Sequence, residues 1–316
     1  MPVNPAHIKY KNLKERGIFM KKKSVILLLA VSIVAASVTG CGKSSGGEAV
    51  ESTESTEVVD TVSASNGGVV TKLCDYDRIP VTIDNFVVTE DDVSSMTAAL
   101  LENSGFDTTL EETSDEAIAE AFADYGISSK EDFTAYIREY LGDYADSCME
   151  NAISGEVEEY LLKNCTVELD ESYVTSRTDL YQKLFTEQYV GDASLDEYLS
   201  SVYDMTTDEA YDAWYDMMSQ QVTLECILGE IADAEGMVVT DDDYSAYLDA
   251  LKSDYPGCSE TEIYEMYGYT EEDGEVFFRA RCLTDKMLNV LASEAEVSYA
   301  EAGISTEESE NSEISE

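Results

Sequence analysis

The sequence predicts a mainly α-helical protein with one short extended segment near the start of its ordered part. Only four prolines occur in 316 residues, which favours long helices because proline breaks a helix interior. Between residues 90 and 294 the apolar residues recur mostly with the period of a helix face rather than with strand alternation. We expect helices at 90–103, 114–125, 129–163, 170–190, 194–202, 207–235, 241–253, 259–268 and 272–294, punctuated by glycine and proline.

Strand-like alternation is clearest within 69–88, where Ile79, Val81 and Ile83 share one face of an extended segment. Pro80 lies between them and lacks a backbone N–H. It therefore predicts a position at the edge of a sheet.

A short internal sequence repeat marks the starts of two predicted helices. Residues 87–93 match 238–244, and 165–171 are a looser third copy. Thr89 and Thr240 are expected to cap these helices, because threonine accepts a hydrogen bond there and the following acidic residues favour the positive helix end. A Ca²⁺ interpretation of Asp241–Asp243 lacks the alternating ligands and late glutamate of an EF-hand loop, so we prefer capping.

Two predicted helices carry clear apolar stripes. One stripe belongs to the 207–235 helix and the other to the 272–294 helix, and each follows the spacing of a helix face that packs on a core. Their members are Tyr211, Trp214, Tyr215, Met218 and Val222 in the first, and Val276, Ala280, Leu283, Met287, Val290 and Leu291 in the second.

The first forty residues have the pattern of an export signal. Lys21–Lys23 follow Met20, and an apolar run from Val25 to Ala36 follows them. This order is typical of a secretory signal peptide, and the run is too short for the ~20 residues that span a bilayer. Val38–Cys41 resembles the lipobox of bacterial lipoproteins, in which the cysteine receives the lipid and becomes the new N-terminus. An uncleaved membrane anchor is the alternative.

This signal predicts the organisation of the whole chain. Lipidation at Cys41 would anchor the protein stably, since lipoproteins of this type carry two or more acyl groups. Gly, Ser, Thr and Glu dominate the residues after it and the final residues. We expect a misassigned start at 1–19, the signal peptide at 20–40, a flexible tether at 41–68, a helical domain at 69–300 and a disordered acidic tail at 301–316.

The charge and the rarity of histidine limit the chemistry. The formal net charge is −48, which disfavours nucleic acid and anionic lipid as partners of the protein body. It favours either simple solubility or attraction to basic client chains. The single histidine, His7, precedes Cys41, so histidine-based catalysis and histidine-bound metals are excluded from the mature chain. No cofactor or metal is expected.

Six cysteines besides Cys41 remain in the predicted mature chain. No CxxC motif occurs, so neither a thiol-redox site nor a zinc site is indicated. An even number outside the cell permits 15 disulfide pairings, and several of the cysteines also occupy apolar helix positions. We expect structural roles, paired or buried, for Cys74, Cys148, Cys165, Cys226, Cys258 and Cys282.

Several segments together resemble the trigger factor family of chaperones. The order and spacing of these segments, rather than any one of them, carry the resemblance, which extends over about 69–298. Leu73–Val81 and Val88–Val93 resemble the segment before the family's isomerase domain. The remaining matches are Ser129–Arg138, Val167–Val174, Leu195–Thr206 and, as the best of them, Ile231–Asp241.

The resemblance implies an elongated helical cradle with two arms that binds unfolded or newly exported polypeptides without catalysis. The lipid signal replaces the family's ribosome-binding domain, so no ribosome contact is expected. Only 104–113 lies where the family has its peptidyl-prolyl isomerase domain, and no catalytic residue is carried over. The alternatives are an isomerase-related protein by descent and a lipoprotein scaffold or solute-binding component.

The lipoprotein signal predicts a location, and the resemblance to trigger factor implies a contact surface. We expect the chain on the extracytoplasmic face of the membrane of a Gram-positive cell. Aromatic and methionine side chains adapt to varied apolar clients. The candidates for client binding are Tyr181, Leu184, Phe185, Tyr189, Tyr211, Trp214, Tyr215, Met217 and Met218. For each of them, packing between helices is the alternative role.

Overall fold

The computed structural model describes residues 67–106 and 109–300. The predicted signal peptide, the predicted lipidation site at Cys41, nearly all of the predicted tether and the predicted acidic tail lie outside these ranges. Within them, no helix combines the length and apolar character needed to cross a membrane. The chain forms two compact units: unit 1 contains 67–73 and 165–287, and unit 2 contains 74–164 and 288–300.

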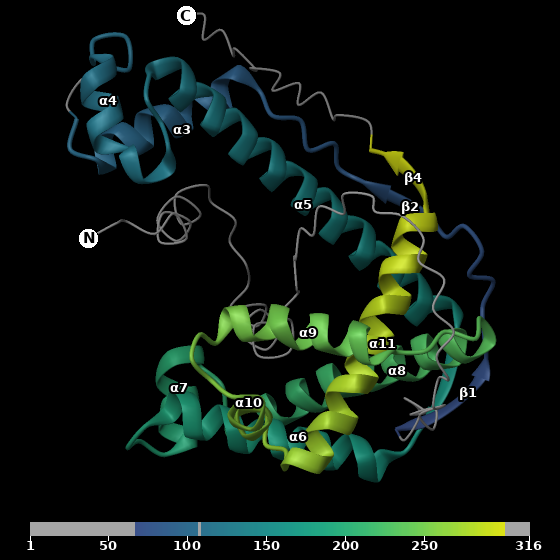
Figure 1. Cartoon of the computed structure of the whole chain (residues 1–316). Coiled ribbons are helices and arrows are strands. Elements are labelled where there is room, and N and C mark those ends of the chain that lie inside the picture. Colours follow the sequence, from purple (N-terminus) through teal and green to yellow (C-terminus); the bar gives the residue numbers. More distant parts are fainter. Residues whose placement is uncertain (1–66, 107–108, 301–316) are drawn as a thin grey trace, which may run out of the picture. The chain divides into compact units, whose positions relative to one another are not determined.

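Helices make up most of the described chain, which confirms the mainly α prediction (Figure 1). The expected 114–125 helix is α4 followed by a 3₁₀ turn, and the expected 170–190 helix is α6 followed by a π turn. The α-helices are α3 (Glu90–Asn103), α4 (Asp115–Ala121), α5 (Lys130–Asn164), α6 (Glu171–Phe185), α7 (Leu195–Tyr203), α8 (Thr207–Ala234), α9 (Asp241–Asp254), α10 (Glu260–Met266) and α11 (Glu271–Glu294). The short turns are η2 (Ala123–Tyr125) and η3 (Thr186–Val190).

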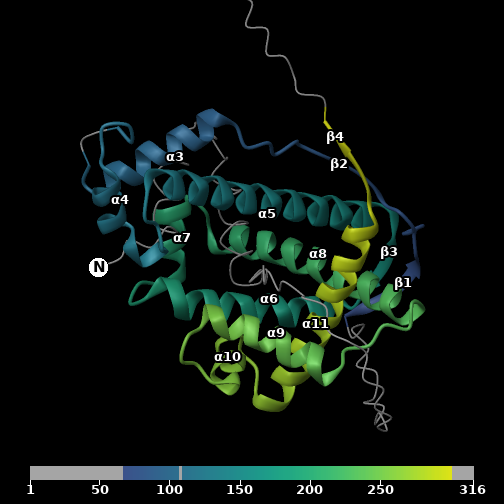
Figure 2. The same cartoon turned by 45° about the horizontal axis from the view of Figure 1, so that its top comes forward.

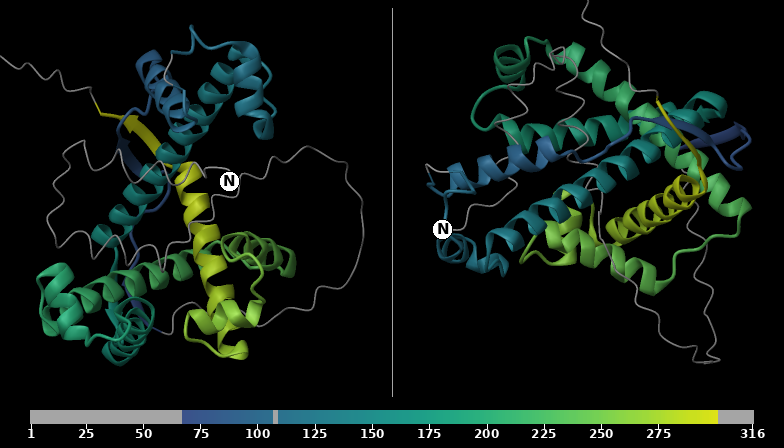
Figure 3. Two further views of the ribbon diagram at one scale, coloured as in Figure 1. Left: turned by 90° about the vertical axis from the view of Figure 1, so that its left-hand side faces the viewer. Right: turned by 90° about the horizontal axis from the view of Figure 1, so that it is seen from above.

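Each unit contains a two-stranded sheet. In unit 1, β1 (Gly68–Lys72) pairs antiparallel with β3 (Thr166–Leu169). In unit 2, β2 (Pro80–Ile83) pairs parallel with β4 (Glu296–Tyr299), and Figure 3 shows the two strands side by side. The extended segment predicted within 69–88 thus contains two strands of different sheets, and β4 was not predicted.

The position of Pro80 confirms its predicted place at a sheet edge. The Glu296 N–H donates to the Ile79 carbonyl and the Ala300 N–H donates to the Ile83 carbonyl, both at 2.9 Å. In a strand, alternate residues direct their backbone groups to opposite sides. The backbone groups of Val81 therefore face β4, and those of Pro80 face the free side, where its missing N–H removes no bond of the ladder.

The predicted helix caps are confirmed. The Thr89 side chain accepts from the Asp92 N–H, and the Thr240 side chain accepts from the Asp243 N–H. In both helices the acidic side chain bonds back to the threonine N–H, which completes a capping box. Within the described ranges, no group of three or more metal-ligating side chains comes together.

The core of unit 2 surrounds the beginning of the long helix α5. Helices α3 and α4 pack against this end of α5 (Figure 2). Phe133 and Ile137 are fully buried there, and Val157 and Leu161 are fully buried towards the other end. No residue of α5 between Ile137 and Val157 is buried. The fully buried residues of α5 therefore lie towards its two ends, and the middle of that helix is only partly covered.

Two apolar clusters lie among the described residues of unit 1. One joins α6, α7 and α8 around Trp214, which is 1% exposed. The other joins α9, α10 and α11 around Phe278 and includes Cys282. Burial raises the pKa of the Cys226 and Cys282 thiols to about 11, so these two cysteines are inert buried thiols at neutral pH.

The apolar stripe predicted for α11 is only partly correct. Leu283, Met287 and Leu291 are buried, as expected. Val276 is 48% exposed, so its placement in the core was wrong. It lies two residues before Phe278, which is about 200° around a helix, and so it points away from the buried face.

Candidate functional site

A small pocket lies within unit 1, between its two apolar clusters. Its volume is about 50 Å³, and it is partly open to solvent. Helices α6 and α8 supply one side, and α9, α11 and the α10–α11 turn supply the other. The lining residues are Arg177, Leu180, Tyr181, Leu184, Met218, Gln221, Tyr247, Leu251, Tyr267, Tyr269, Phe277, Phe278 and Arg281.

Aromatic rings from the α10–α11 turn and the start of α11 form one wall. Tyr269 stacks on Phe277 with ring centroids 4.4 Å apart, and Tyr267 meets Phe278 edge to face at 5.1 Å. Gly268, between the two tyrosines, has φ of +82°, and a Cβ added to it would lie 2.5 Å from a methyl carbon of Leu180. Only glycine combines this backbone with such a close approach, so Gly268 holds the aromatic turn against α6.

The opposite wall contains a buried ion pair. The Arg177 guanidinium donates to both carboxylate oxygens of Glu225, at 3.1 and 3.3 Å. The two side chains are only 11% and 17% exposed. Gln221 also donates to Glu225 at 3.0 Å, and the Arg177 guanidinium lies 5.3 Å from the centre of the Phe277 ring. The paired charges make this wall electrically neutral while keeping it rigid.

Burial keeps the pocket tyrosines neutral. It raises the pKa of Tyr247 to about 12, with Asp285 adding to the effect, and it raises the pKa of Tyr269 to about 12 against the opposing charge of Arg177. Burial also raises the pKa of Tyr267. These phenols therefore stay protonated at neutral pH and present ring faces and hydroxyl groups for contact. Such groups are not poised for proton transfer near neutral pH.

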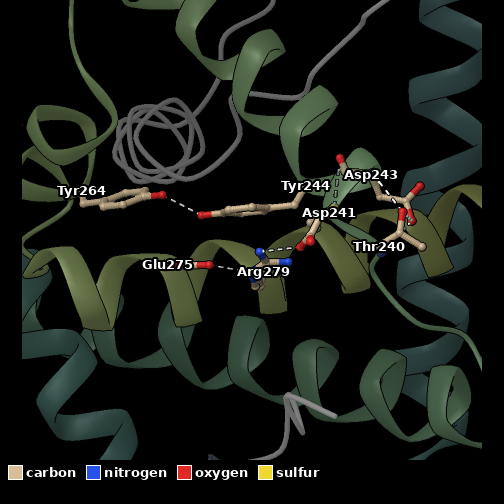
Figure 4. Close-up of polar contacts among 8 residues, drawn as sticks. Thr240, Asp241, Asp243, Tyr244, Tyr264, Glu275 and Arg279 are labelled. Carbon is tan, nitrogen blue, oxygen red and sulfur yellow. Dashed lines mark hydrogen bonds and ion pairs between the residues drawn. The ribbon is translucent and has the colours of Figure 1, made fainter. Parts of the chain in front are cut away.

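A polar clamp holds α9 against α11 in the same unit (Figure 4). Arg279 bonds to Asp241 and Glu275, both at 2.9 Å, and lies 4.3 Å from the Tyr244 ring centre. The Tyr244 and Tyr264 hydroxyl groups meet at 2.6 Å in the interior. This clamp fixes the two helices that supply Tyr247 and the phenylalanines of the pocket.

The structure brings three of the predicted client-binding residues to the pocket and places the others elsewhere in unit 1. Tyr181, Leu184 and Met218 line the pocket, although Tyr181 and Met218 are only 4% and 2% exposed. Phe185 and Trp214 belong to the core. Tyr189, Tyr211, Tyr215 and Met217 are half-buried, and Tyr211 donates to Asp179 at 2.8 Å. Contact of any of these residues with a client stays a prediction, and burial limits it for Tyr181, Phe185, Trp214 and Met218.

Sequence reasoning missed the second wall of the pocket. Tyr247, Tyr267, Tyr269, Phe277 and Phe278 were not among the predicted site residues. The density of aromatic residues between 244 and 278 was a usable signal, because large rings gathered in one stretch of sequence dominate the surfaces that they form.

Most positive charges of unit 1 are neutralised by neighbouring acids. Arg177, Lys252, Arg279 and Lys286 each form an ion pair within the unit, at 2.8 to 3.1 Å. Their partners leave many acidic residues of the unit without a cation, so its surface is strongly negative. Such a surface attracts basic polypeptide segments over a distance of about 10 Å at moderate salt.

Comparison with known proteins identifies the family. A family model of the C-terminus of the bacterial trigger factor protein matches residues 129–293, which is more than half of the chain and includes every residue of the pocket. No curated protein and no solved structure matches the chain. The chain belongs to the trigger factor C-terminal family.

Proposed function

We propose that this protein is an exported, lipid-anchored chaperone that holds unfolded polypeptides by contact. Membership of the trigger factor family supports binding of unfolded chains in general. The observation that carries the proposal is the partly open pocket of unit 1, with its aliphatic and aromatic walls. An exposed apolar side chain of an unfolded client is the group that such a pocket suits.

The size of the pocket defines what it accepts. Its volume of about 50 Å³ is about a third of the ~150 Å³ of a cavity that binds benzene. It therefore suits the end of an aliphatic side chain rather than a whole ring. Burial of one such side chain contributes about 1.5–3 kcal/mol, so the contact is weak and reversible, as release of a client requires.

Filling the pocket tests this site. Leu184→Phe places a larger side chain in the cavity, and Val202→Phe introduces the same ring at a residue of α7 that is 51% exposed and outside the lining. We expect the chain to suppress aggregation of a reduced, unfolded secreted protein. We expect Leu184→Phe to weaken client binding about tenfold or more, while Val202→Phe leaves it unchanged.

Two results would count against the proposal. Absence of suppression by the unaltered chain at several-fold molar excess would remove the chaperone function. Equal activity of both variants, with unchanged thermal unfolding, would remove the pocket as its site. A photoreactive residue at Tyr267 would report in cells whether many clients or one fixed partner occupy the pocket.

The export and anchoring part of the proposal rests on the N-terminal sequence. The basic, apolar and lipobox-like segments ending at Cys41 support lipidation and a position on the extracytoplasmic face of the membrane. Cys41→Ser should abolish incorporation of labelled palmitate and release the protein from the membrane fraction. A chain that carries no lipid and stays in the cytosol would contradict this part alone.

Peptidyl-prolyl isomerase activity is the enzymatic alternative. Helix α3 ends at Asn103 and α4 begins at Asp115, so only a short connection lies where the isomerase domain would be expected. We expect a proline-containing test peptide to isomerise at its uncatalysed rate in the presence of the chain. A concentration-dependent acceleration would favour the enzymatic alternative.

A further inference from the structure

The two outer edges of the two-stranded sheet in unit 2 differ. The edge of β2 is guarded by a proline, and the edge of β4 is open, with backbone N–H groups that face outward. On β2, the backbone of Pro80 and Thr82 faces the outer side, and Pro80 has no N–H to offer there. On β4, the Glu296 and Ala300 N–H groups bond to β2. The N–H and C=O groups of Val297 and Tyr299 therefore face away from β2, and no third strand joins the sheet in the described part of the chain.

The apolar face of this sheet also continues towards the open edge. Val81 and Ile83 are 3% and 4% exposed. Their partners in the neighbouring strand, Val297 and Tyr299, share their face of the sheet, because aligned residues of paired strands point the same way. Val297 is only half-buried and Tyr299 is 56% exposed, so this apolar face is covered at β2 but partly exposed to solvent at β4.

From these observations we propose that the outer edge of β4 binds an extended segment of an unfolded client as an added strand. The inference rests on the proposed chaperone function and gives it a second contact. Backbone groups of Val297 and Tyr299 would bond to the client backbone, which every client sequence possesses. Alternate apolar side chains of the client would cover Val297 and Tyr299, as the next strand of a sheet does.

The negative charge around β4 indicates which client segments fit its outer edge best. Glu296 is exposed beside this edge, and acidic residues greatly outnumber basic ones in unit 2. An extended segment with apolar alternation and flanking lysine or arginine therefore fits better than an acidic one. The guarded edge of β2 directs such a segment to β4, because a strand added beside Pro80 would lack one hydrogen bond.

Amide hydrogen exchange of the full chain tests the proposal. The probes are two synthetic peptides of alternating valine and threonine, one flanked by lysines and the other by glutamates. We expect the lysine-flanked peptide to slow exchange of the Val297 and Tyr299 amides at least tenfold at saturation. The Glu296 and Ala300 amides, which already bond to β2, serve as internal controls and should change little.

A matched pair of variants isolates the backbone contribution. Val297→Pro removes one outward N–H without removing a bond to β2, and Val297→Thr keeps that N–H with a side chain of similar shape. We expect the proline variant to bind the lysine-flanked peptide about three- to tenfold more weakly than the threonine variant. Unchanged exchange of the Ala300 amide would show that β2 and β4 remain paired in both variants.

The failure of this proposal differs from failure of the proposed function. Aggregation suppression that depends on Leu184 but brings no protection of Val297 and Tyr299 would overturn the edge site and leave the chaperone function in place. Protection of these two amides without any peptide would also overturn it, because a second copy or another part of the chain would then occupy the edge. Absence of both peptide binding and aggregation suppression would overturn both proposals.

Discussion

The two units offer different kinds of surface to a polypeptide. Unit 1 presents side chains, namely the rings and aliphatic groups that line its pocket. Unit 2 presents backbone, namely the outward groups of Val297 and Tyr299 on β4. A side-chain pocket discriminates among residues by size, whereas a backbone edge accepts almost any extended sequence. A protein that must hold unrelated clients weakly gains from combining the two.

Individual glycines of the two units differ in how closely they are packed. A Cβ added to Gly67, Gly268 or Gly274 in unit 1 would lie within 2.5 Å of a neighbouring side chain. A Cβ added to Gly142 or Gly155 on α5 of unit 2 would meet nothing within 4 Å. These three glycines of unit 1 are therefore sites of close approach, and Gly268 is the one at the pocket, whereas Gly142 and Gly155 have open space beside them.

The largest expected effect is the loss of stability when one buried ring is removed from the core of either unit. Trp214→Ala in unit 1 and Phe133→Ala in unit 2 each remove a buried ring and should lower the free energy of unfolding by about 3–5 kcal/mol. Because each ring belongs to a different core cluster, amide exchange should accelerate first in the unit that carries the substitution. Equal acceleration of amide exchange in both units would contradict this distinction, since it would mean that the two units unfold together.

Trp214→Phe is the control for the first of these substitutions. The Trp214 indole N–H is buried and has no hydrogen-bond partner among the described residues. Its removal relieves an unsatisfied donor, while the smaller ring loses some packing. We expect a net change within about 1.5 kcal/mol, measured by chemical denaturation followed by circular dichroism. A loss as large as that of Trp214→Ala would show that the N–H is bonded in solution.

Local patterns explain how much of the fold was predictable. The start of α3 followed from Thr89 and the acidic residues after it, and the buried face of α8 followed from the spacing of Trp214, Met218 and Val222. These features depend on neighbours within one or two helix turns. Strand β4 does not: the Ser298 hydroxyl meets that of Thr82, 216 positions away in the sequence, and a four-residue strand carries too little pattern to indicate its partner.

The candidate site was predictable on one side only. The apolar stripe of α8 indicated Met218, and the client-binding candidates on α6 included Tyr181 and Leu184; all three line the pocket. The wall formed by Tyr267 and Phe277 depends on which face of α11 packs on α6, and this choice is made by tertiary contacts such as that between Gly268 and Leu180. A helical period fixes which residues share a face, but it does not identify the neighbour that covers it.

Two glycine substitutions, one in each unit, test this difference in packing, and their expected effects on stability are intermediate in size. Gly268→Ala in unit 1 should lower the free energy of unfolding by about 1–3 kcal/mol, because its φ of +82° disfavours a side chain and Leu180 blocks the Cβ. Gly142→Ala in unit 2 should raise it by about 0.5–1 kcal/mol, because alanine favours the helix and the space is open. Denaturant titration of both variants provides the measurement. The same sign for both substitutions would contradict the contrast between the units.

The smallest expected effect concerns the pH dependence of the contacts between α9 and α11 in unit 1. Hydrogen bonds from Lys286 and Thr240 lower the pKa of Asp243 to about 2, and the Lys286–Asp243 distance is 2.8 Å. Because folding lowers this pKa, the ion pair stabilises the folded state at pH values above ~4, the pKa of the carboxyl group in the unfolded chain. The stabilisation disappears as the pH falls towards 2.

Both side chains are about one-third exposed, so Lys286→Met should cost only about 0.5 kcal/mol at pH 6. Lys183→Met removes the same charge from an exposed position of α6 that forms no ion pair with the described residues, and it serves as the control. The stability difference between the two variants should shrink between pH 4 and pH 2, and a constant difference over this range would show that the pair does not form in solution.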